Sequence, residues 1–234
     1  MDGIHWGNGA VGLVIREYVV GSVIQHYSSL EVSLSTSQYG FEKRLKVFKE
    51  AGYDATLKEL DKNLIGKNIL EILPPNSNTN DMIRMSLSYL MFLKRKRFGK
   101  IKARGCADGR PQREYIPKLE SSSPCVKTHS LFISCLVDAF ERRKVVIVDI
   151  PGAFLSADWP ADAPDCWIRF EGTMVDMICQ IKPEYRKLIR KTTRKNGGVR
   201  KVLVGKVTRA IYGTLLGAVL FYNKLKGVLV KMGF

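Results

Sequence analysis

Apolar residues recur at helical spacing in three stretches of the chain. These stretches cover residues 38–62, 128–143 and 215–229. Thr128 could cap the second helix, and Cys135 falls within its apolar stripe, so we expect that stripe to be part of the core. The apolar positions that define the first two helices are Phe41, Leu45, Phe48, Leu57, Leu60, Leu131, Phe132, Cys135, Leu136, Ala139 and Phe140.

Short runs of strand-forming residues alternate with turn residues between these helices. Phe98 and Gly99 lie near the turn of a basic hairpin, and Gly197-Gly198 predicts a second turn. Asp81 could cap a short helix over residues 82–89. Residues 11–23 could hold one or two strands, but residues 1–37 have no assignable role. The predicted strands occupy residues 69–73, 90–94, 100–104, 166–170 and 199–207.

The stretch VVIVDIPGAFL, residues 145–155, begins with five residues of strand type and contains a single acid, Asp149. A short apolar run of this length predicts a buried strand. A carboxylate there is costly unless it has a partner. A divalent metal held by oxygen ligands is one such partner. An Asp that caps a turn, or that meets a surface Lys, is the other interpretation.

The charge of the chain is strongly basic and concentrated. The formal net charge is +16, with 45% hydrophobic residues, a proportion that suits a globular core. Residues 94–113 contain nine Lys and Arg and one acid, and residues 182–209 contain eleven and one. Such segments suggest a polyanion surface. Two solvated loops would be the plainer explanation. No basic amphipathic helix accompanies either segment, which disfavours a membrane surface.

The cysteine pattern argues against both a disulfide framework and a zinc site. The chain has five cysteines and no C-x-x-C pair. A reducing compartment fits this pattern. The apolar residues 9–24 are interrupted by Arg16 and Glu17, so they are too short and too charged to span a membrane, and no signal peptide is evident.

The spacing of Asp149 and Phe154 within D-I-P-G-A-F-L resembles the first catalytic motif of copia-type reverse transcriptases. The resemblance implies that Asp149 binds both Mg²⁺ ions of the intact enzyme, where Mn²⁺ could substitute. It implies that the carbonyl of Ile150 is a further metal ligand. It also implies that Phe154 lies under the sugar of the incoming nucleotide and excludes a 2′-hydroxyl.

Two other stretches carry the same resemblance. Lys102 and Arg104 match the K-x-R strand of the fingers hairpin, which meets the incoming triphosphate, and residues 104–115 continue in the manner of one branch of the family. Tyr212 and Gly213 match the motif A-L-Y-G, which implies contacts with template and nucleotide. Leu216 departs from this motif, because the family usually has Gln or Arg there, and this departure puts those contacts in doubt.

The resemblance implies an α+β fold, with the fingers and partial palm of a right-hand polymerase and an antiparallel sheet with packed helices. Residues 1–37 would be an unassigned lead segment, residues 38–127 fingers-like, and residues 128–234 a partial palm, truncated before the second catalytic motif. The chain contains no Asp-Asp pair, which the family needs to complete its metal site. We therefore expect a fragment of an RNA-directed DNA polymerase that is inactive alone.

The implied partners are an RNA or DNA template with its primer, and deoxynucleoside triphosphates. Ribonuclease H and integrase regions would belong to the parent polyprotein. The implied location is the cytoplasm, inside a virus-like particle, or the nucleus. Two interpretations of other classes stay open: a basic nucleic-acid-binding module without catalysis, and a decayed retroelement remnant.

Overall fold

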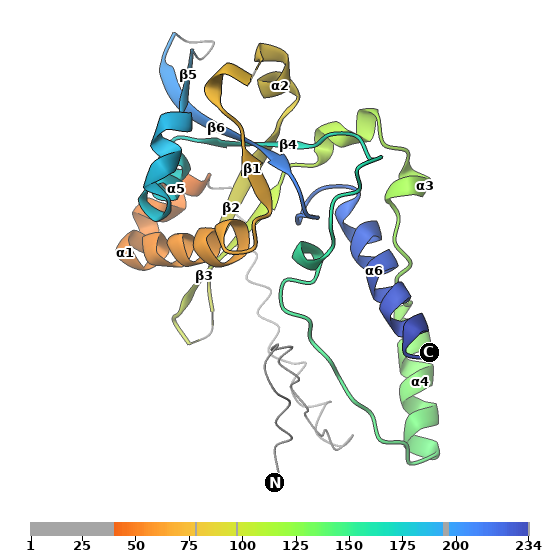
Figure 1. Cartoon of the computed structure of the whole chain (residues 1–234). Coiled ribbons are helices and arrows are strands. Elements are labelled where there is room, and N and C mark those ends of the chain that lie inside the picture. The colour runs from red at the N-terminus through yellow and green to blue at the C-terminus, as the bar shows by residue number, and fades with distance from the viewer. Residues whose placement is uncertain (1–39, 78, 97, 194–196, 234) are drawn as a thin grey trace. The chain divides into compact units, whose positions relative to one another are not determined.

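The computed structural model describes residues 40–77, 79–96, 98–193 and 197–233, and it divides into two compact units (Figure 1). The first, here called the sheet unit, comprises Tyr39–Ser123 and Phe154–Phe234. The second, the helix unit, is described over Pro124–Ala153. The strands predicted within residues 11–23, and the interrupted apolar stretch of residues 9–24, lie outside the described residues.

The sheet unit combines helices and strands, so the α+β expectation is confirmed at this coarse level. Its strands are β1 (Leu70–Ile72), β2 (Leu87–Arg95), β3 (Ile101–Ala107), β4 (Trp167–Glu171), β5 (Arg190–Thr193) and β6 (Val199–Val207). Its helices are α1 (Phe41–Glu59), α2 (Asn80–Met85), α3 (Lys118–Ser121), α5 (Thr173–Ile181) and α6 (Gly217–Lys231). A π-helical turn (Leu60–Ile65) follows α1, and short 3₁₀ turns cover Pro75–Ser77, Arg110–Glu114, Phe154–Ser156 and Pro183–Leu188.

The strands form one sheet in the order β1-β6-β4-β2-β3, with β5 also paired to β6. The prediction of an antiparallel sheet is wrong at one place, because β2 and β4 run parallel. That contact consists of two residue pairs, Leu87 with Ile168 and Ser88 with Arg169.

The guanidinium of Arg169 reinforces this short contact. It donates hydrogen bonds to the Ile83 carbonyl at 2.6 Å and to the hydroxyls of Ser86 and Ser88 at 3.1 and 2.9 Å. It also pairs with the Glu171 carboxylate at 2.5 Å. One partly buried side chain therefore links α2, β2 and β4, and its charge is balanced by an acid on its own strand.

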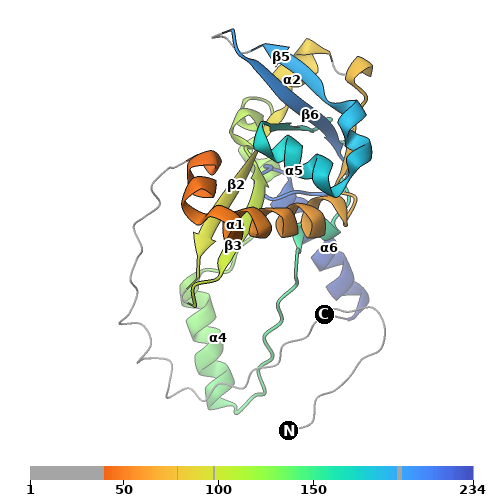
Figure 2. The same ribbon diagram turned by 90° about the vertical axis from the view of Figure 1, so that its left-hand side faces the viewer.

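Helices α1 and α5 lie across the same face of the sheet, and the main core fills the space between them and the strands (Figure 2). The backbone of α1 kinks at Lys49, where φ is 47°. Residues buried in this core include Leu60, Leu87, Leu93, Ile168, Phe170, Val175, Met177, Ile178 and Leu203. No helix in the described ranges has the length and apolarity needed to cross a lipid bilayer.

The predicted hairpin, the return strand at residues 199–207 and the first and last helices are confirmed. The short helix before the hairpin differs from its prediction. Thr79, and not Asp81, caps α2, because its hydroxyl accepts a hydrogen bond from the Met82 N–H at 3.1 Å. The helix ends at Met85, and Leu87 begins a strand, since residues 87 and 88 pair with β4.

In the helix unit, α4 (Thr128–Phe140) confirms the predicted helix but not its burial. None of its residues is buried, and Phe140 is 90% exposed. Cys135, which we expected in a core, is exposed. Lys127 takes the N-cap position in place of Thr128. An apolar stripe predicts only that a helix can bury one face, and the described part of this unit supplies nothing to cover α4.

The predicted buried strand around Asp149 is not a strand in the structure. Residues 143–150 have no regular secondary structure, Asp149 is exposed, and its four apolar neighbours at residues 145–148 are each at least half exposed. Each described strand pairs with at least one other described strand, and none of them pairs with residues 143–150. β-Branched residues favour an extended backbone, but a strand also needs a neighbour that completes its hydrogen bonds. The expectation that Asp149 lies on a strand of the sheet is therefore wrong.

Candidate functional site

The β2–β3 hairpin separates its side chains into two faces of opposite character. Side chains alternate along each strand, so one face is buried beneath α1 and the other is exposed. The buried face comprises Tyr89, Met91, Leu93, Ala103 and Ala107. The exposed face, called the outer face from here on, comprises Phe92, Lys94, Lys102 and Arg104.

Helix α1 fixes both edges of this hairpin through polar side chains. Arg44 donates a hydrogen bond to the carbonyl of Leu93 on β2 at 2.5 Å. At the other edge, Glu59 accepts a hydrogen bond from the Gly105 N–H on β3 at 3.1 Å. The outer face is therefore presented by a backbone that is held at both edges.

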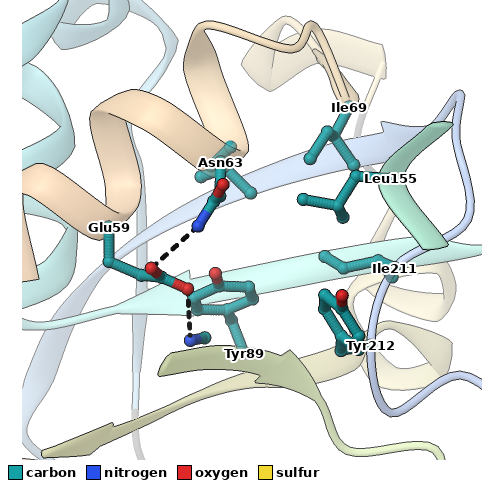
Figure 3. Close-up of a pocket in the computed structure, with 9 residues that line it drawn as sticks. Glu59, Asn63, Ile69, Tyr89, Leu155, Ile211 and Tyr212 are labelled. Atoms are coloured by element: carbon teal, nitrogen blue, oxygen red, sulfur yellow. Dashed lines mark hydrogen bonds between the residues drawn. The ribbon is translucent and has the colours of Figure 1, made fainter. Parts of the chain in front are cut away.

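Glu59 also borders a small cavity between the hairpin and the turn that follows α1 (Figure 3). Its second carboxylate oxygen accepts a hydrogen bond from Asn63 at 2.8 Å. Burial, and then the charge of Glu59, raise the pKa of Tyr89 far above its usual range, so this tyrosine stays neutral. The cavity measures about 10 Å³, which is room for one water molecule and excludes a nucleotide.

Phe154 and Tyr212, two of the predicted site residues, are in contact. Their rings stack with centroids 4.7 Å apart and planes inclined by 23°. The ring of Phe221 on α6 meets Phe154 from another side at 5.9 Å. Phe154 is thus positioned by two aromatic neighbours, one of which comes from the A-I-Y-G stretch.

Gly213 packs its backbone against β3. Its φ is +91°, and a Cβ placed on it would lie 2.0 Å from the carbonyl oxygen of Ala107. Beside it, the Tyr212 carbonyl accepts a hydrogen bond from the Ala107 N–H at 2.7 Å. Only glycine fits a positive φ at such a close approach. The A-I-Y-G stretch therefore adjoins the strand that carries Lys102 and Arg104.

Gln112 is a residue that the sequence did not single out. It is 1% exposed, and its side-chain oxygen accepts a hydrogen bond from the Leu215 N–H at 2.9 Å. Its amide nitrogen lies 3.8 Å from the sulfur of Cys166. Gln112 thus joins the turn after β3 to the segment that follows Gly213. Its only signal in the sequence is a neutral polar residue among charged ones, in R-P-Q-R-E.

The sheet unit contains five of the predicted site residues, and the structure brings them together in two groups. Phe154, Tyr212 and Gly213 form one group, next to the end of β3. Lys102 and Arg104 form the other, on the outer face of the same strand.

Asp149 and Ile150 belong to the helix unit, in its irregular segment. Across the described ranges, no three His, Cys, Asp or Glu side chains gather where they could hold a metal. One exposed carboxylate with a neighbouring carbonyl does not make a two-ion site.

Comparison with known proteins returned no matching family model, no matching curated protein and no matching solved structure.

Proposed function

We propose that this chain is a fragment of an RNA-directed DNA polymerase of the copia-type reverse transcriptase class, corresponding to fingers and the first half of a palm. The observation that carries the proposal is the meeting of three separated motifs around β3. The K-x-R residues lie on that strand, Gly213 packs on its end, and Phe154 stacks on Tyr212. Its partners would be a primed template and deoxynucleoside triphosphates.

The metal chemistry is the part of this function that the 234 residues do not complete. The family resemblance assigns Asp149 and the Ile150 carbonyl to Mg²⁺, but two-metal phosphoryl transfer needs further carboxylates. We therefore expect that this polypeptide binds nucleic acid without extending a primer.

Primer extension on an RNA template, with each nucleotide type and Mg²⁺, tests the proposal. The 234-residue chain should give no product, and template-dependent product would show that our account of the metal site is wrong. A second protein should carry the missing palm, an aromatic-x-Asp-Asp hairpin and a thumb after Phe234. We expect it to extend the primer, and Asp149→Asn should abolish the reaction because the change removes a charged oxygen ligand.

Two further variants of that longer protein sharpen the test. Phe154→Ala should admit ribonucleotides, because it opens space beside the 2′ carbon. Leu216→Gln should restore activity if the departure at that position is what limits it. If the longer protein that keeps Asp149 stays inactive even with Leu216→Gln, the polymerase proposal fails.

A second candidate function is a basic nucleic-acid-binding module without catalysis. The exposed basic side chains of the outer face, Lys94, Lys102 and Arg104, favour this function. The two candidates differ in one result: both predict binding of a primed template by the 234 residues, and only the first predicts catalysis once the palm is completed.

A further inference from the structure

The two basic segments look alike in sequence but differ in how their charges are neutralised. Several bases of residues 182–209 are paired with acids in the folded chain. These pairs are Arg200 with Glu171 at 2.7 Å, Lys201 with Asp176 at 2.7 Å, Lys206 with Asp165 at 2.6 Å and Arg209 with Asp158 at 3.7 Å. Four of the nine described bases of the second segment are therefore offset by acids, which weakens its positive field in part.

The outer face of the β2–β3 hairpin has no such compensation. Among residues 40–77, 79–96, 98–193 and 197–233, no acid forms an ion pair with Lys94, Lys102 or Arg104. Lys94 stands directly opposite Lys102 in the strand register. Like charges that face one another across a strand pair are destabilising. An anion bound between them would remove that repulsion.

An aromatic ring lies within this positive field. Phe92 is directly opposite Arg104, two residues from Lys94 along β2, and it is 50% exposed. Proteins hold single-stranded nucleic acid with exposed aromatic side chains that lie among Lys and Arg. The cationic side chains contact the phosphates, and the aromatic ring stacks on a nucleobase. The guanidinium of Arg104 can contribute to the same stack.

We propose that the outer face binds a single-stranded nucleic acid, with one unpaired base stacked on Phe92 and the neighbouring phosphates on Lys94, Lys102 and Arg104. A paired base does not offer its face, so a duplex would leave the ring without a partner. A vesicle surface or an acidic peptide would satisfy the charges but not the stacking. The inference rests on the proposed function only in that it requires nucleic-acid binding, and it requires no catalysis.

The test compares two probes of equal length and charge: a labelled oligothymidylate and the same strand with every base removed. Affinity of the 234-residue chain is measured by fluorescence anisotropy over a range of salt concentrations. We expect the base-containing strand to bind more tightly. Phe92→Ala should weaken its binding between about fivefold and about 100-fold. The same variant should leave binding of the abasic strand unchanged.

Two lysine variants separate charge from stacking. Lys102→Ala should weaken both probes and lower the slope of log affinity against log salt by about 1. Lys191→Ala, at an exposed position of β5 in the second basic segment, is the matched control and should change neither probe. Because Phe92 and both lysines are exposed, each variant should still fold; Lys102→Ala, which removes the repulsion with Lys94, should unfold at the same temperature as the parent or slightly above it.

Each contrary result has a distinct meaning. If Phe92→Ala weakens both probes equally, or neither, the stacking site is wrong while nucleic-acid binding stands. If Lys191→Ala matches Lys102→Ala, binding is not confined to the outer face. If the parent binds neither oligonucleotide but binds anionic lipid vesicles or a polyglutamate peptide, both this inference and the nucleic-acid part of the proposed function are overturned. The longer protein could be inactive in primer extension while Phe92→Ala still weakens binding of the base-containing strand only. That result would overturn the proposed polymerase function and leave this inference standing.

Discussion

The side-chain oxygen of Gln112 accepts a hydrogen bond from the backbone N–H of Leu215 at 2.9 Å, across 103 residues of sequence. Gln112→Ala should leave that N–H without a partner and open a small void, with a loss of about 1–3 kcal/mol in the free energy of unfolding. Urea denaturation followed by circular dichroism measures this. Gln180→Ala is the control: its exposed side chain accepts a hydrogen bond from the Tyr53 hydroxyl at 2.7 Å but leaves no buried group without a partner, so it should cost less than about 1 kcal/mol. Equal effects would contradict a bridging role for Gln112.

Two glycines should respond in opposite directions to the same substitution. Gly213→Ala forces a Cβ to within 2.0 Å of the Ala107 oxygen at a φ of +91°, so we expect it to cost about 2 kcal/mol or more. Gly227→Ala, inside α6, meets nothing within 4 Å and should stabilise the chain by about 0.5–1 kcal/mol. Thermal unfolding of both variants measures the difference. A harmless Gly213→Ala would mean that the A-I-Y-G stretch does not pack on β3.

A pair of isoleucines tests the exposed segment around Asp149. Ile168 is fully buried in β4, whereas Ile147 is 58% exposed. Ile168→Ala should cost about 2–5 kcal/mol, and Ile147→Ala no more than about 0.5 kcal/mol. Equilibrium denaturation in urea checks both values. A large cost at Ile147 would show that residues 145–148 are covered in solution, as the sequence alone predicts.

Thiol reactivity should follow burial. Burial, and then the charge of Asp165, raise the pKa of Cys166 to about 12, so almost none of it is thiolate at neutral pH. We expect Cys125 and Cys135, which are exposed, to react with a maleimide in the native chain, and Cys166 to react only after unfolding. Mass spectrometry of labelled peptides measures this. Early labelling of Cys166 would contradict its burial.

The same shift has a consequence for stability at high pH. The unfolded thiol ionises near pH 9 and the folded one near pH 12. The contribution of Cys166 is therefore complete below about pH 9 and is lost as the pH rises toward 12. Cys166→Ala should reduce the loss of stability over that interval, as measured by urea denaturation at a series of pH values.

The sequence predicts best those elements whose signals are local. The return strand β6 is indicated by its valine-rich run and by the preceding Gly197-Gly198 turn. The basic hairpin follows from the same kind of local pattern, with its turn near Phe98 and Gly99, whereas its register is known only from the structure. The coarse α+β class follows from these elements together.

What the sequence could not predict depends on distant partners. Residues 145–148 have the same β-branched character as β6, but in the described structure no strand pairs with them. Gln112 has no local pattern that indicates a bond to Leu215. The parallel contact of β2 with β4 likewise joins residues far apart in the chain, and nothing in either strand specifies its direction.

The sheet has two antiparallel parts, the β2–β3 hairpin and the group β1, β6, β4 and β5. Among the described residues they meet only at the two residue pairs between β2 and β4, which form a narrow seam. Arg169 spans that seam with hydrogen bonds to Ile83, Ser86 and Ser88. If the seam opens, these bonds are lost in one event, so the hairpin separates as a cooperative unit and does not fray residue by residue. Amide hydrogen exchange across β2 would therefore report a single opening free energy, to which Arg169 contributes from outside the candidate site.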